Sequence, residues 1–214
     1  MMTDGVQSVL ARVEFSTPGI DEPPAQPTAV ARPALFLRRW LAHPLRTASI
    51  VPSSETLCRH IARLAWPAPG KAVLELGAGT GVVARAMLAA GLAPERLILV
   101  EIDPQMAAHL RACFPEATVI EGDARALPEL LPARWQGRIG SVICGLPLVM
   151  LPIEEQRRFI DAMTAVAPGR GFLQYSYCLT SPLPARRHGL VARREAWTPL
   201  NLPPASVWRY SSAA

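Results

Sequence analysis

A glycine-rich turn between a predicted strand and a predicted helix constrains this chain more than any other feature. Residues 73–81 read Val-Leu-Glu-Leu-Gly-Ala-Gly-Thr-Gly. Glycines at such a turn let the backbone bend sharply and let a ligand approach it closely. The spacing is Gly-x-Gly-x-Gly, which differs from the Gly-x-Gly-x-x-Gly of dinucleotide-binding folds. Glu75 precedes the first glycine by two residues, where it would repel a pyrophosphate and attract a cation such as an α-ammonium.

The chain after residue 52 alternates between strand and helix patterns. Apolar runs predict strands at 71–76, 97–101, 117–120, 140–144 and 171–177, and weaker patterns predict two more at 191–197 and 206–210. Helices are predicted at 53–66, 80–90 and 154–166, with another beginning at Asp103-Pro104. This alternation predicts an α/β fold whose mainly parallel sheet is covered on both faces. The last two strands, joined by a Pro-rich turn, would add an antiparallel edge.

Three further groups of residues follow predicted strands. Glu101 ends the second strand, Asp123 follows the third, and Cys144-Gly145-Leu146-Pro147-Leu148 follows the fourth. Open α/β sheets bind ligands at the carboxyl ends of their strands, so these residues should meet at one site. A carboxylate at Glu101 can accept hydrogen bonds from both hydroxyls of a ribose. A carboxylate at Asp123 can accept one from an adenine amino group.

The four motifs in this order resemble the class I S-adenosylmethionine-dependent methyltransferases over about residues 50–214. The resemblance implies a Rossmann-like, seven-stranded sheet and S-adenosylmethionine as cofactor, with S-adenosylhomocysteine as product. It implies that the methionine part lies at the glycine-rich turn, the ribose at Glu101 and the adenine at Asp123. The implied cofactor-binding residues are Glu75, Gly77, Ala78, Gly79, Gly81, Glu101, Ile102, Asp123, Ala124 and Cys144.

A finer resemblance is to the bacterial phospholipid N-methyltransferases, which convert phosphatidylethanolamine towards phosphatidylcholine. It is carried by FLRRWLAHPLRTASIVPSS at 36–54, GLPL at 145–148, QYSY at 174–177 and NLPPASVWRY at 201–210. Residues 1–32 have no counterpart, and Cys144 stands where the family has a small hydroxyl residue. The resemblance implies methyl transfer to the amine of phosphatidylethanolamine and of its mono- and dimethyl products.

The sequence predicts three regions along the chain. Residues 1–32 are a flexible, Pro-rich segment, residues 33–48 form a basic amphipathic helix, and residues 49–214 form the methyltransferase domain. On a helical wheel, the predicted helix is apolar along one arc and basic on the opposite side, which is typical of a helix in a membrane interface. A helix that packs on the domain would show the same pattern. The expected membrane-contacting residues are Phe36, Leu37, Arg38, Arg39, Trp40 and Leu41.

The net charge of +5 is unevenly distributed. Residues 1–31 sum to −3, residues 32–46 to +4, residues 47–185 to zero and residues 186–214 to +4. Basic segments of this kind suit an anionic partner such as lipid headgroups, nucleic acid or a phosphorylated substrate, although they are also compatible with ordinary surface charge. With no signal peptide or membrane span expected, we predict a cytoplasmic protein, peripheral on the inner face of the cytoplasmic membrane.

Methyl transfer to an amine requires a neutral lone pair and correct alignment more than a strong base. We predict that Tyr177 orients the amine and holds the methylated cation, and that backbone groups of Gly145 and Leu146 accept its protons. The two tyrosines of the fifth strand, Tyr175 and Tyr177, should face the same side. The expected substrate-binding residues are Ser53, Pro147 and Tyr175, with Arg186 and Arg187 for the headgroup phosphodiester. Contact of these two arginines with other lipids at the membrane surface is an equal alternative.

The main alternative is an RNA adenine-N6 methyltransferase of the ribosomal RNA dimethylase type. Such enzymes carry an aromatic residue after the proline of the strand-4 motif, which stacks on an extruded base. Here Leu148 occupies that position, so no nucleic-acid partner is expected. A protein that binds the cofactor without turnover is a further alternative. The histidines and cysteines show no metal-ligand spacing, so no metal is predicted.

Overall fold

The computed structural model describes residues 55–177, 181–199, 201 and 203–213. The predicted segments 1–32 and 33–48, which include the six membrane-contacting candidates, and the candidate Ser53 lie outside the described residues. None of the helices in the part of the chain that the structure describes is long and apolar enough to span a bilayer.

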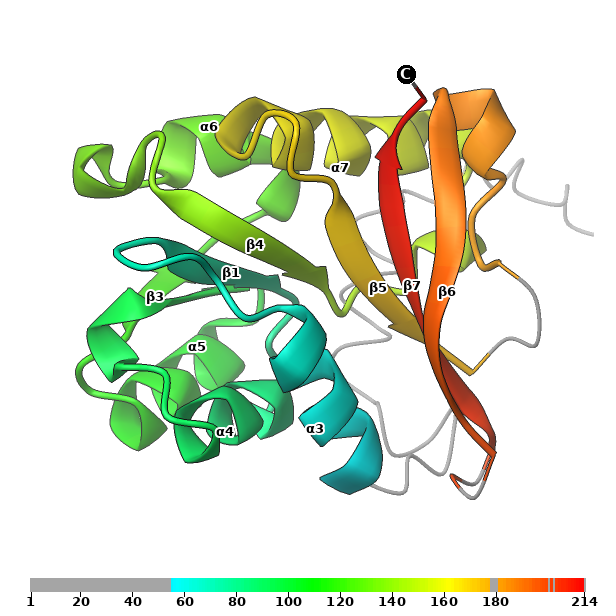
Figure 1. The fold of residues 1–214 in the computed structure, drawn as a ribbon. Coiled ribbons are helices and arrows are strands. Elements are labelled where there is room, and N and C mark those ends of the chain that lie inside the picture. Colours follow the sequence, from blue (N-terminus) through cyan, green and yellow to red (C-terminus); the bar gives the residue numbers. More distant parts are fainter. Residues whose placement is uncertain (1–54, 178–180, 200, 202, 214) are drawn as a thin grey trace, which may run out of the picture. The chain divides into compact units, whose positions relative to one another are not determined.

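The described residues form a seven-stranded sheet with strand order β3-β2-β1-β4-β5-β7-β6. The first five strands are parallel, and β7 is antiparallel to both β5 and β6 (Figure 1). This confirms the predicted fold. The predicted C-terminal hairpin joins the sheet through β7, so β6 is the edge strand. The strands are β1 Ala72–Leu76, β2 Leu97–Glu101, β3 Thr118–Glu121, β4 Ile139–Cys144, β5 Phe172–Ser176, β6 Leu190–Thr198 and β7 Ala205–Ser212.

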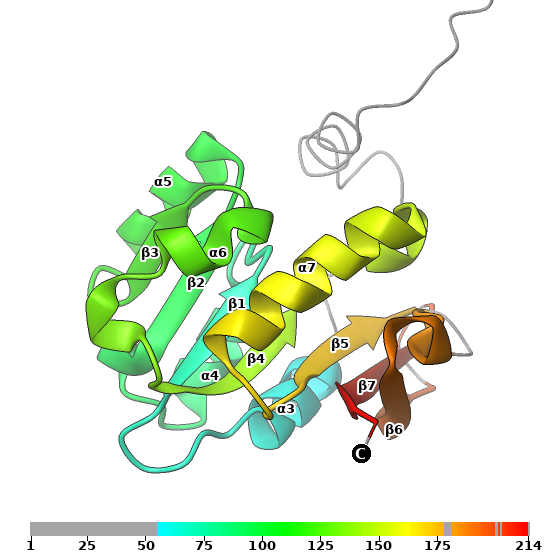
Figure 2. The ribbon, with the colours of Figure 1, turned by 90° about the horizontal axis from the view of Figure 1, so that it is seen from above.

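Helices cover both faces of the sheet, with α6 and α7 on one and α3, α4 and α5 on the other (Figures 1 and 2). The α-helices are α3 Glu55–Leu64, α4 Val82–Ala89, α5 Pro104–Cys113, α6 Leu127–Leu130 and α7 Ile153–Val166. Single 3-10 turns are η1 Pro94–Arg96, η2 Ala124–Ala126, η3 Ala133–Trp135, η4 Leu148–Met150 and η5 Ala185–His188. All residues of β1 and β2 are buried, as expected for central parallel strands.

Strand alternation divides the core into two layers. Leu74 and Leu76 pack towards α6 and α7, whereas Val73 packs towards α3 and α4. Glu75 therefore projects into the layer beneath α3 and α4, although it is a carboxylate in an otherwise apolar strand. Its position identifies the first part of the candidate site.

Candidate active site

The glycine-rich turn connects β1 to α4 in a conformation that suits only glycine. Gly77 and Gly81 have φ values of 69° and 74°, which L-amino acids with side chains rarely adopt. A methyl group on Gly77 would lie 2.6 Å from Leu146 Cδ2, and one on Gly81 would lie 2.4 Å from Phe114 Cε2. The turn is therefore packed between the strand-4 motif and the end of α5. Because Gly81 is left-handed, α4 begins at Val82 rather than at the predicted residue 80.

Glu75 is a buried carboxylate, 1% exposed, and its Oε2 atom has no hydrogen-bond partner among the described residues. Burial, and secondarily the charge of Glu101, raise its pKa to about 8. Proteins rarely leave a buried carboxylate oxygen unpaired, because its desolvation costs several kcal/mol. A ligand with a cationic group, such as the α-ammonium of S-adenosylmethionine, would supply the missing partner. The carboxylate thus fits the predicted cofactor.

Glu101, at the end of β2, holds the glycine-rich turn in place. Its Oε2 accepts a hydrogen bond from Gly79 N at 2.9 Å. Its Oε1 accepts from Ile102 N at 2.9 Å and from Asp103 N at 3.0 Å. About four acceptor positions are available on a carboxylate, so roughly one remains for a ligand. The sequence predicted Glu101 as a ribose ligand and did not indicate this backbone-supporting role.

Asp123 follows β3 and pairs with Arg125. Its Oδ1 accepts from Arg125 N at 2.9 Å, and Arg125 Nε lies 3.0 Å from both carboxylate oxygens. The Nη2 atom of the same guanidinium also pairs with Oδ2. Burial alone would raise the pKa of Asp123, but the hydrogen bonds and charge of Arg125 hold that pKa below its usual value. The carboxylate is therefore ionised at neutral pH.

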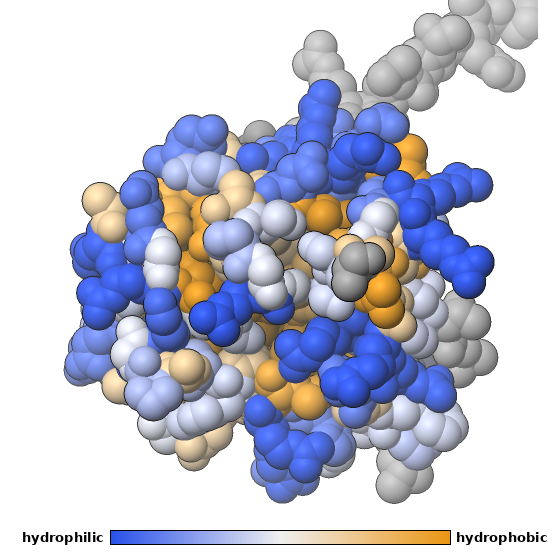
Figure 3. Space-filling model, turned by 45° about the horizontal axis from the view of Figure 1, so that its top comes forward, coloured by the Kyte–Doolittle hydropathy of each residue, from blue (hydrophilic) through white to orange (hydrophobic). Residues whose placement is uncertain are grey.

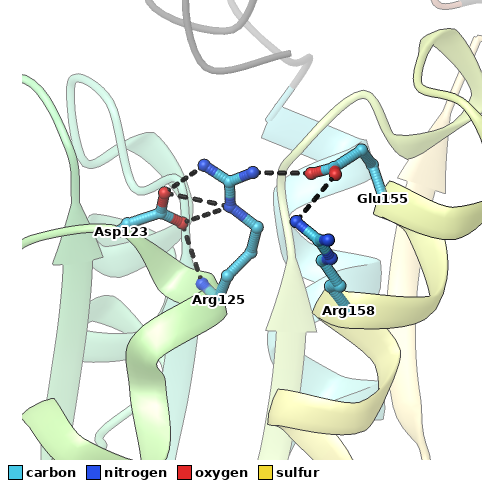
Figure 4. Close-up of polar contacts among 4 residues, drawn as sticks. All are labelled: Asp123, Arg125, Glu155 and Arg158. Carbon is cyan, nitrogen blue, oxygen red and sulfur yellow. Dashed lines mark hydrogen bonds and ion pairs between the residues drawn. The ribbon is translucent and has the colours of Figure 1, made fainter. Parts of the chain in front are cut away.

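Arg125 also connects this loop to α7 (Figure 4). Its Nη1 donates to Glu155 Oε2 at 2.5 Å, and Arg158 Nη1 lies 3.1 Å from Glu155 Oε1. The Arg125 guanidinium lies 5.7 Å from the centre of the Phe159 ring. Glu155 is almost buried, whereas Arg158 is exposed, so only the Arg125–Glu155 part of this network is shielded from water. Sequence reasoning identified Asp123 and missed both Arg125 and Glu155.

A small pocket lies where β1, β2, β3 and β4 end. It contains residues of all four strand-end motifs and adds Phe159 from α7, whereas the candidates Glu75, Gly79, Gly81 and Cys144 are not in its lining. Its lining is Gly77, Val100, Glu101, Ile102, Gly122, Asp123, Ala124, Leu146 and Phe159. Ala78 is buried just beyond this lining. The predicted adenine and ribose positions therefore share one concave surface.

The strand-4 turn lies directly beside the glycine-rich turn. Gly145 N donates to Leu76 O at 2.8 Å. The Leu146 carbonyl accepts from Leu148 N at 2.8 Å and from Gln174 Nε2 at 3.1 Å. Both acceptor positions of this carbonyl are therefore occupied, which weakens the expectation that it receives a proton from an amine. Pro147 precedes η4, and its carbonyl accepts from Met150 N at 3.0 Å.

Cys144 is fully buried at the end of β4, in the core layer beneath α6 and α7. Burial raises the pKa of its thiol to about 12, so the side chain is a neutral thiol at physiological pH. It therefore serves as a small packing group beside the site and brings no charge to it.

Tyr175 and Tyr177 both pack in the layer beneath α3 and α4, as the strand alternation predicts. A Cβ on Gly145 would lie 2.8 Å from the Tyr175 hydroxyl and 3.0 Å from Gly77 O. Burial, and secondarily the charge of Glu75, raise the pKa of Tyr175 well above 10, so its hydroxyl stays protonated. The Tyr175 hydroxyl therefore reaches the strand-4 turn, whereas the sequence favoured Tyr177, whose role stays a prediction.

Arg186 and Arg187 lie on η5 and are exposed. Hydrogen bonds tie η5 to α7, because Arg157 Nη2 donates to Arg187 O at 3.3 Å and His188 Nε2 lies 2.9 Å from Gln156 Oε1. The two arginines therefore stand at the amino-terminal end of α7, and a role in binding a lipid phosphodiester remains a prediction.

Comparisons with known proteins agree with this geometry. A family model described as a methyltransferase domain matches residues 73–171. An ornithine lipid N-methyltransferase from Singulisphaera acidiphila is 33% identical over 180 residues, which are 81% of this chain and 93% of that protein. A ribosomal RNA small subunit methyltransferase A from Leptothrix cholodnii is 35% identical over 95 residues, which are 44% of this chain and 34% of that protein.

Solved structures share the fold at low sequence identity. The magnesium protoporphyrin IX methyltransferase from Synechocystis PCC 6803, solved with bound SAH, has a TM-score of 0.54 and 14% identity, covering 85% of this chain and 95% of that chain. The chain therefore belongs to the class I S-adenosylmethionine-dependent methyltransferases, with S-adenosylmethionine as its methyl donor.

Proposed function

We propose that this enzyme methylates the amine of phosphatidylethanolamine, and of its mono- and dimethyl products, towards phosphatidylcholine. The observation that carries the proposal is the 33% identity to a lipid N-methyltransferase along 93% of that protein's length. The same relative favours ornithine lipid as a second candidate substrate. Both lipids present an amine at a membrane surface, so the proposed chemistry is shared and the headgroup distinguishes them.

The cofactor contacts that we propose follow from the site. Glu75 pairs with the α-ammonium of S-adenosylmethionine, the glycine-rich turn follows its methionine part, Glu101 accepts from the ribose, and Asp123 accepts from the adenine. Glu75 has an unpaired oxygen for this contact, and Glu101 retains about one acceptor position. When bound, the cofactor supplies an activated methyl group.

The remaining task of the protein is to present a neutral amine. A primary amine in water has a pKa near 10, and a dry site lowers it by disfavouring the ammonium. The Tyr175 hydroxyl stays protonated and retains acceptor lone pairs, so it can accept from an amine N–H without removing the proton. We propose that Tyr175 orients the amine lone pair in this way, with Tyr177 further along the same side.

Base stacking, on which the RNA alternative depends, has no support at the expected position. Leu148 stands where an aromatic would stack, and it is 0% exposed because it belongs to the core layer beneath α6 and α7. Its side chain is therefore not available to an extruded base. The relative that acts on ribosomal RNA matches only 95 residues of this chain.

The proposal is tested by radiolabel transfer from S-adenosylmethionine to three substrates in parallel. These are anionic vesicles containing phosphatidylethanolamine, the same vesicles containing ornithine lipid, and total RNA. We expect label in the phosphatidylethanolamine vesicles, and thin-layer separation counts the methyl groups added. Label in ornithine lipid alone would identify ornithine lipid as the substrate in place of phosphatidylethanolamine. Label in RNA alone would overturn the lipid proposal.

Arg125 gives a prediction about the adenine side of the site. Arg125→Ala removes the bridge between Asp123 and Glu155. The almost buried Glu155 then keeps only the exposed Arg158 as a partner. We expect the KM for S-adenosylmethionine to rise about tenfold, while kcat changes less, because Asp123 and Phe159 lose a common support. Steady-state kinetics measure both values. The control Arg134→Ala removes an exposed arginine that stacks on Trp135 and should change neither. A normal KM in Arg125→Ala would show that the bridge is not needed to shape the site.

A further inference from the structure

Three segments are joined beside the strand-4 turn, and we refer to residues 148–158 and 185–188 together as the rim. They comprise η4, the first part of α7, and η5. Gln156 connects all three, because its Nε2 donates to Leu151 O at 2.9 Å and its Oε1 lies 2.9 Å from His188 Nε2. Arg157 adds a hydrogen bond to Arg187 O. η4 follows Pro147 of the strand-4 turn directly in the chain, and η5 is joined to it through Gln156, so the rim begins at the candidate active site.

Two large apolar side chains of the rim project outwards. Val149 is 45% and Met150 is 55% exposed, whereas Leu148 and Leu151 on either side are 0% and 6% exposed. The two buried leucines anchor the turn in the core and hold the exposed pair at the surface. Single exposed apolar residues are common, whereas these two are adjacent and form a small apolar patch on the rim.

Exposed arginines belong to the same rim. The rim contains Arg157, Arg158, Arg186 and Arg187, all exposed, against Glu154 and Glu155, which gives a net charge of +2 (four minus two). Glu155 is almost buried and already pairs with Arg125 and Arg158. Hydrophilic residues surround apolar ones over the face that carries α6 and α7 (Figure 3). An exposed apolar tip among cations suits an anionic lipid surface better than a neutral or cationic partner.

We propose that the rim is a docking surface for an anionic bilayer, with Val149 and Met150 entering the interface and the arginines facing lipid phosphates. This inference rests on the proposed lipid substrate, because an amine lipid can reach Gly145 without leaving the bilayer only if the surround of the site touches the membrane. It adds a contact within the folded domain to the predicted N-terminal helix. The rim therefore acts in presenting substrate, and the amine chemistry stays with the site itself.

The test compares two double variants of the full chain by sedimentation with anionic vesicles. Val149→Ser with Met150→Ser should lower the vesicle partition coefficient about tenfold, because two apolar side chains lose their burial. The matched control is Val191→Ser with Trp197→Ser, which changes two residues of β6 that are 53% and 51% exposed. Thermal melts check that both variants fold. Equal binding of the rim variant and the wild type, or an equal loss in the control, would overturn the proposal.

Charge and partner class are tested separately. Arg186→Gln with Arg187→Gln should weaken binding to anionic vesicles and reduce its salt dependence, with little change on neutral vesicles. Loss of RNA binding by this variant with vesicle binding unchanged would assign the rim to nucleic acid and overturn the proposal.

A soluble substrate separates this inference from the proposed function. The Val149→Ser, Met150→Ser variant should keep wild-type turnover on a short-chain phosphatidylethanolamine below its micelle concentration and lose turnover on vesicles. Equal loss on both substrates would mean that the rim acts in catalysis and would contradict docking. If the wild type methylates neither substrate, the proposed function fails, while vesicle sedimentation still decides whether the rim binds membranes.

Discussion

Glu75→Gln should lose affinity for S-adenosylmethionine by about a hundredfold. The variant keeps the size of the side chain and removes the negative charge that we propose for the α-ammonium. Removing one partner of a buried charge pair typically costs 2–5 kcal/mol, and about 3 kcal/mol corresponds to roughly a hundredfold in Kd. Titration calorimetry measures the change directly. The control Glu116→Gln, on an exposed glutamate, should bind the cofactor normally.

The same variant should be more stable than the wild type, which distinguishes a ligand-binding role from a structural one. The pKa of Glu75 is raised to about 8 in the folded chain, above its unfolded value of 4.5. The folded state therefore loses stability as pH rises from 4.5 towards 8, by about 1.4 kcal/mol per unit. Glu75→Gln has no such penalty, so its Tm advantage should be larger at pH 8.5 than at pH 5. A lower Tm in the variant would show that the carboxylate stabilises the fold.

Cofactor binding should also depend on pH through Glu75. A cation placed beside this carboxylate favours its ionised form, so binding releases a proton below pH 8. Between pH 6 and pH 7.5 the affinity for S-adenosylmethionine should therefore rise with pH in the wild type and stay nearly flat in Glu75→Gln. Calorimetry in buffers of different ionisation enthalpy measures the released proton. An equal slope in both proteins would assign the proton to another group.

Much of the fold was predictable because its signals are local. The second strand, Leu97–Glu101, agrees with the predicted range, since its run of four apolar residues lies between the charged residues Arg96 and Glu101. The helix at Pro104 begins as predicted, because Asp103 Oδ1 caps it by accepting from Gln105 N and Met106 N. The order of the last three strands was not predictable in this way. Periodicity reports which residues form a strand, and it carries no information about which neighbour that strand pairs with.

The candidate site was likewise predictable where its signals are local and not where it depends on packing. Motifs at strand ends predicted that Gly77, Glu101 and Asp123 would meet, because the ends of parallel strands share one edge. The Arg125–Glu155 bridge spans 30 residues of sequence and depends on how α7 packs, which no local pattern encodes. The choice between the two tyrosines depends on register. Cys144 of β4 pairs with Gln174 of β5 in the parallel register. The next residue on each chain is therefore Gly145 and Tyr175, so Tyr175, and not Tyr177, lies level with Gly145.

Gly145→Ala should lower kcat by about a hundredfold, because the added methyl group has no space. It would lie 2.8 Å from the Tyr175 hydroxyl, 3.0 Å from Gly77 O and 3.1 Å from Leu76 O. Two of these atoms belong to the backbone, so the strand-4 turn must move away from the glycine-rich turn. A displacement approaching 1 Å is enough to cost about a hundredfold in a reaction that depends on alignment. Single-turnover kinetics with saturating cofactor measure the loss.

Two further variants locate the origin of that loss. Gly137→Ala changes a glycine with nothing within 4 Å of the added methyl group, and it should lower stability slightly while turnover is kept. Tyr175→Phe should lower kcat about tenfold, since it removes one hydrogen bond to the amine, worth roughly 1.4 kcal/mol. Because the phenol oxygen is the closest atom to the new methyl group, Gly145→Ala with Tyr175→Phe should cost less than the sum of the two single changes. Additive losses would mean that the hydroxyl and the turn act independently, and wild-type turnover in Tyr175→Phe would remove Tyr175 from the reaction.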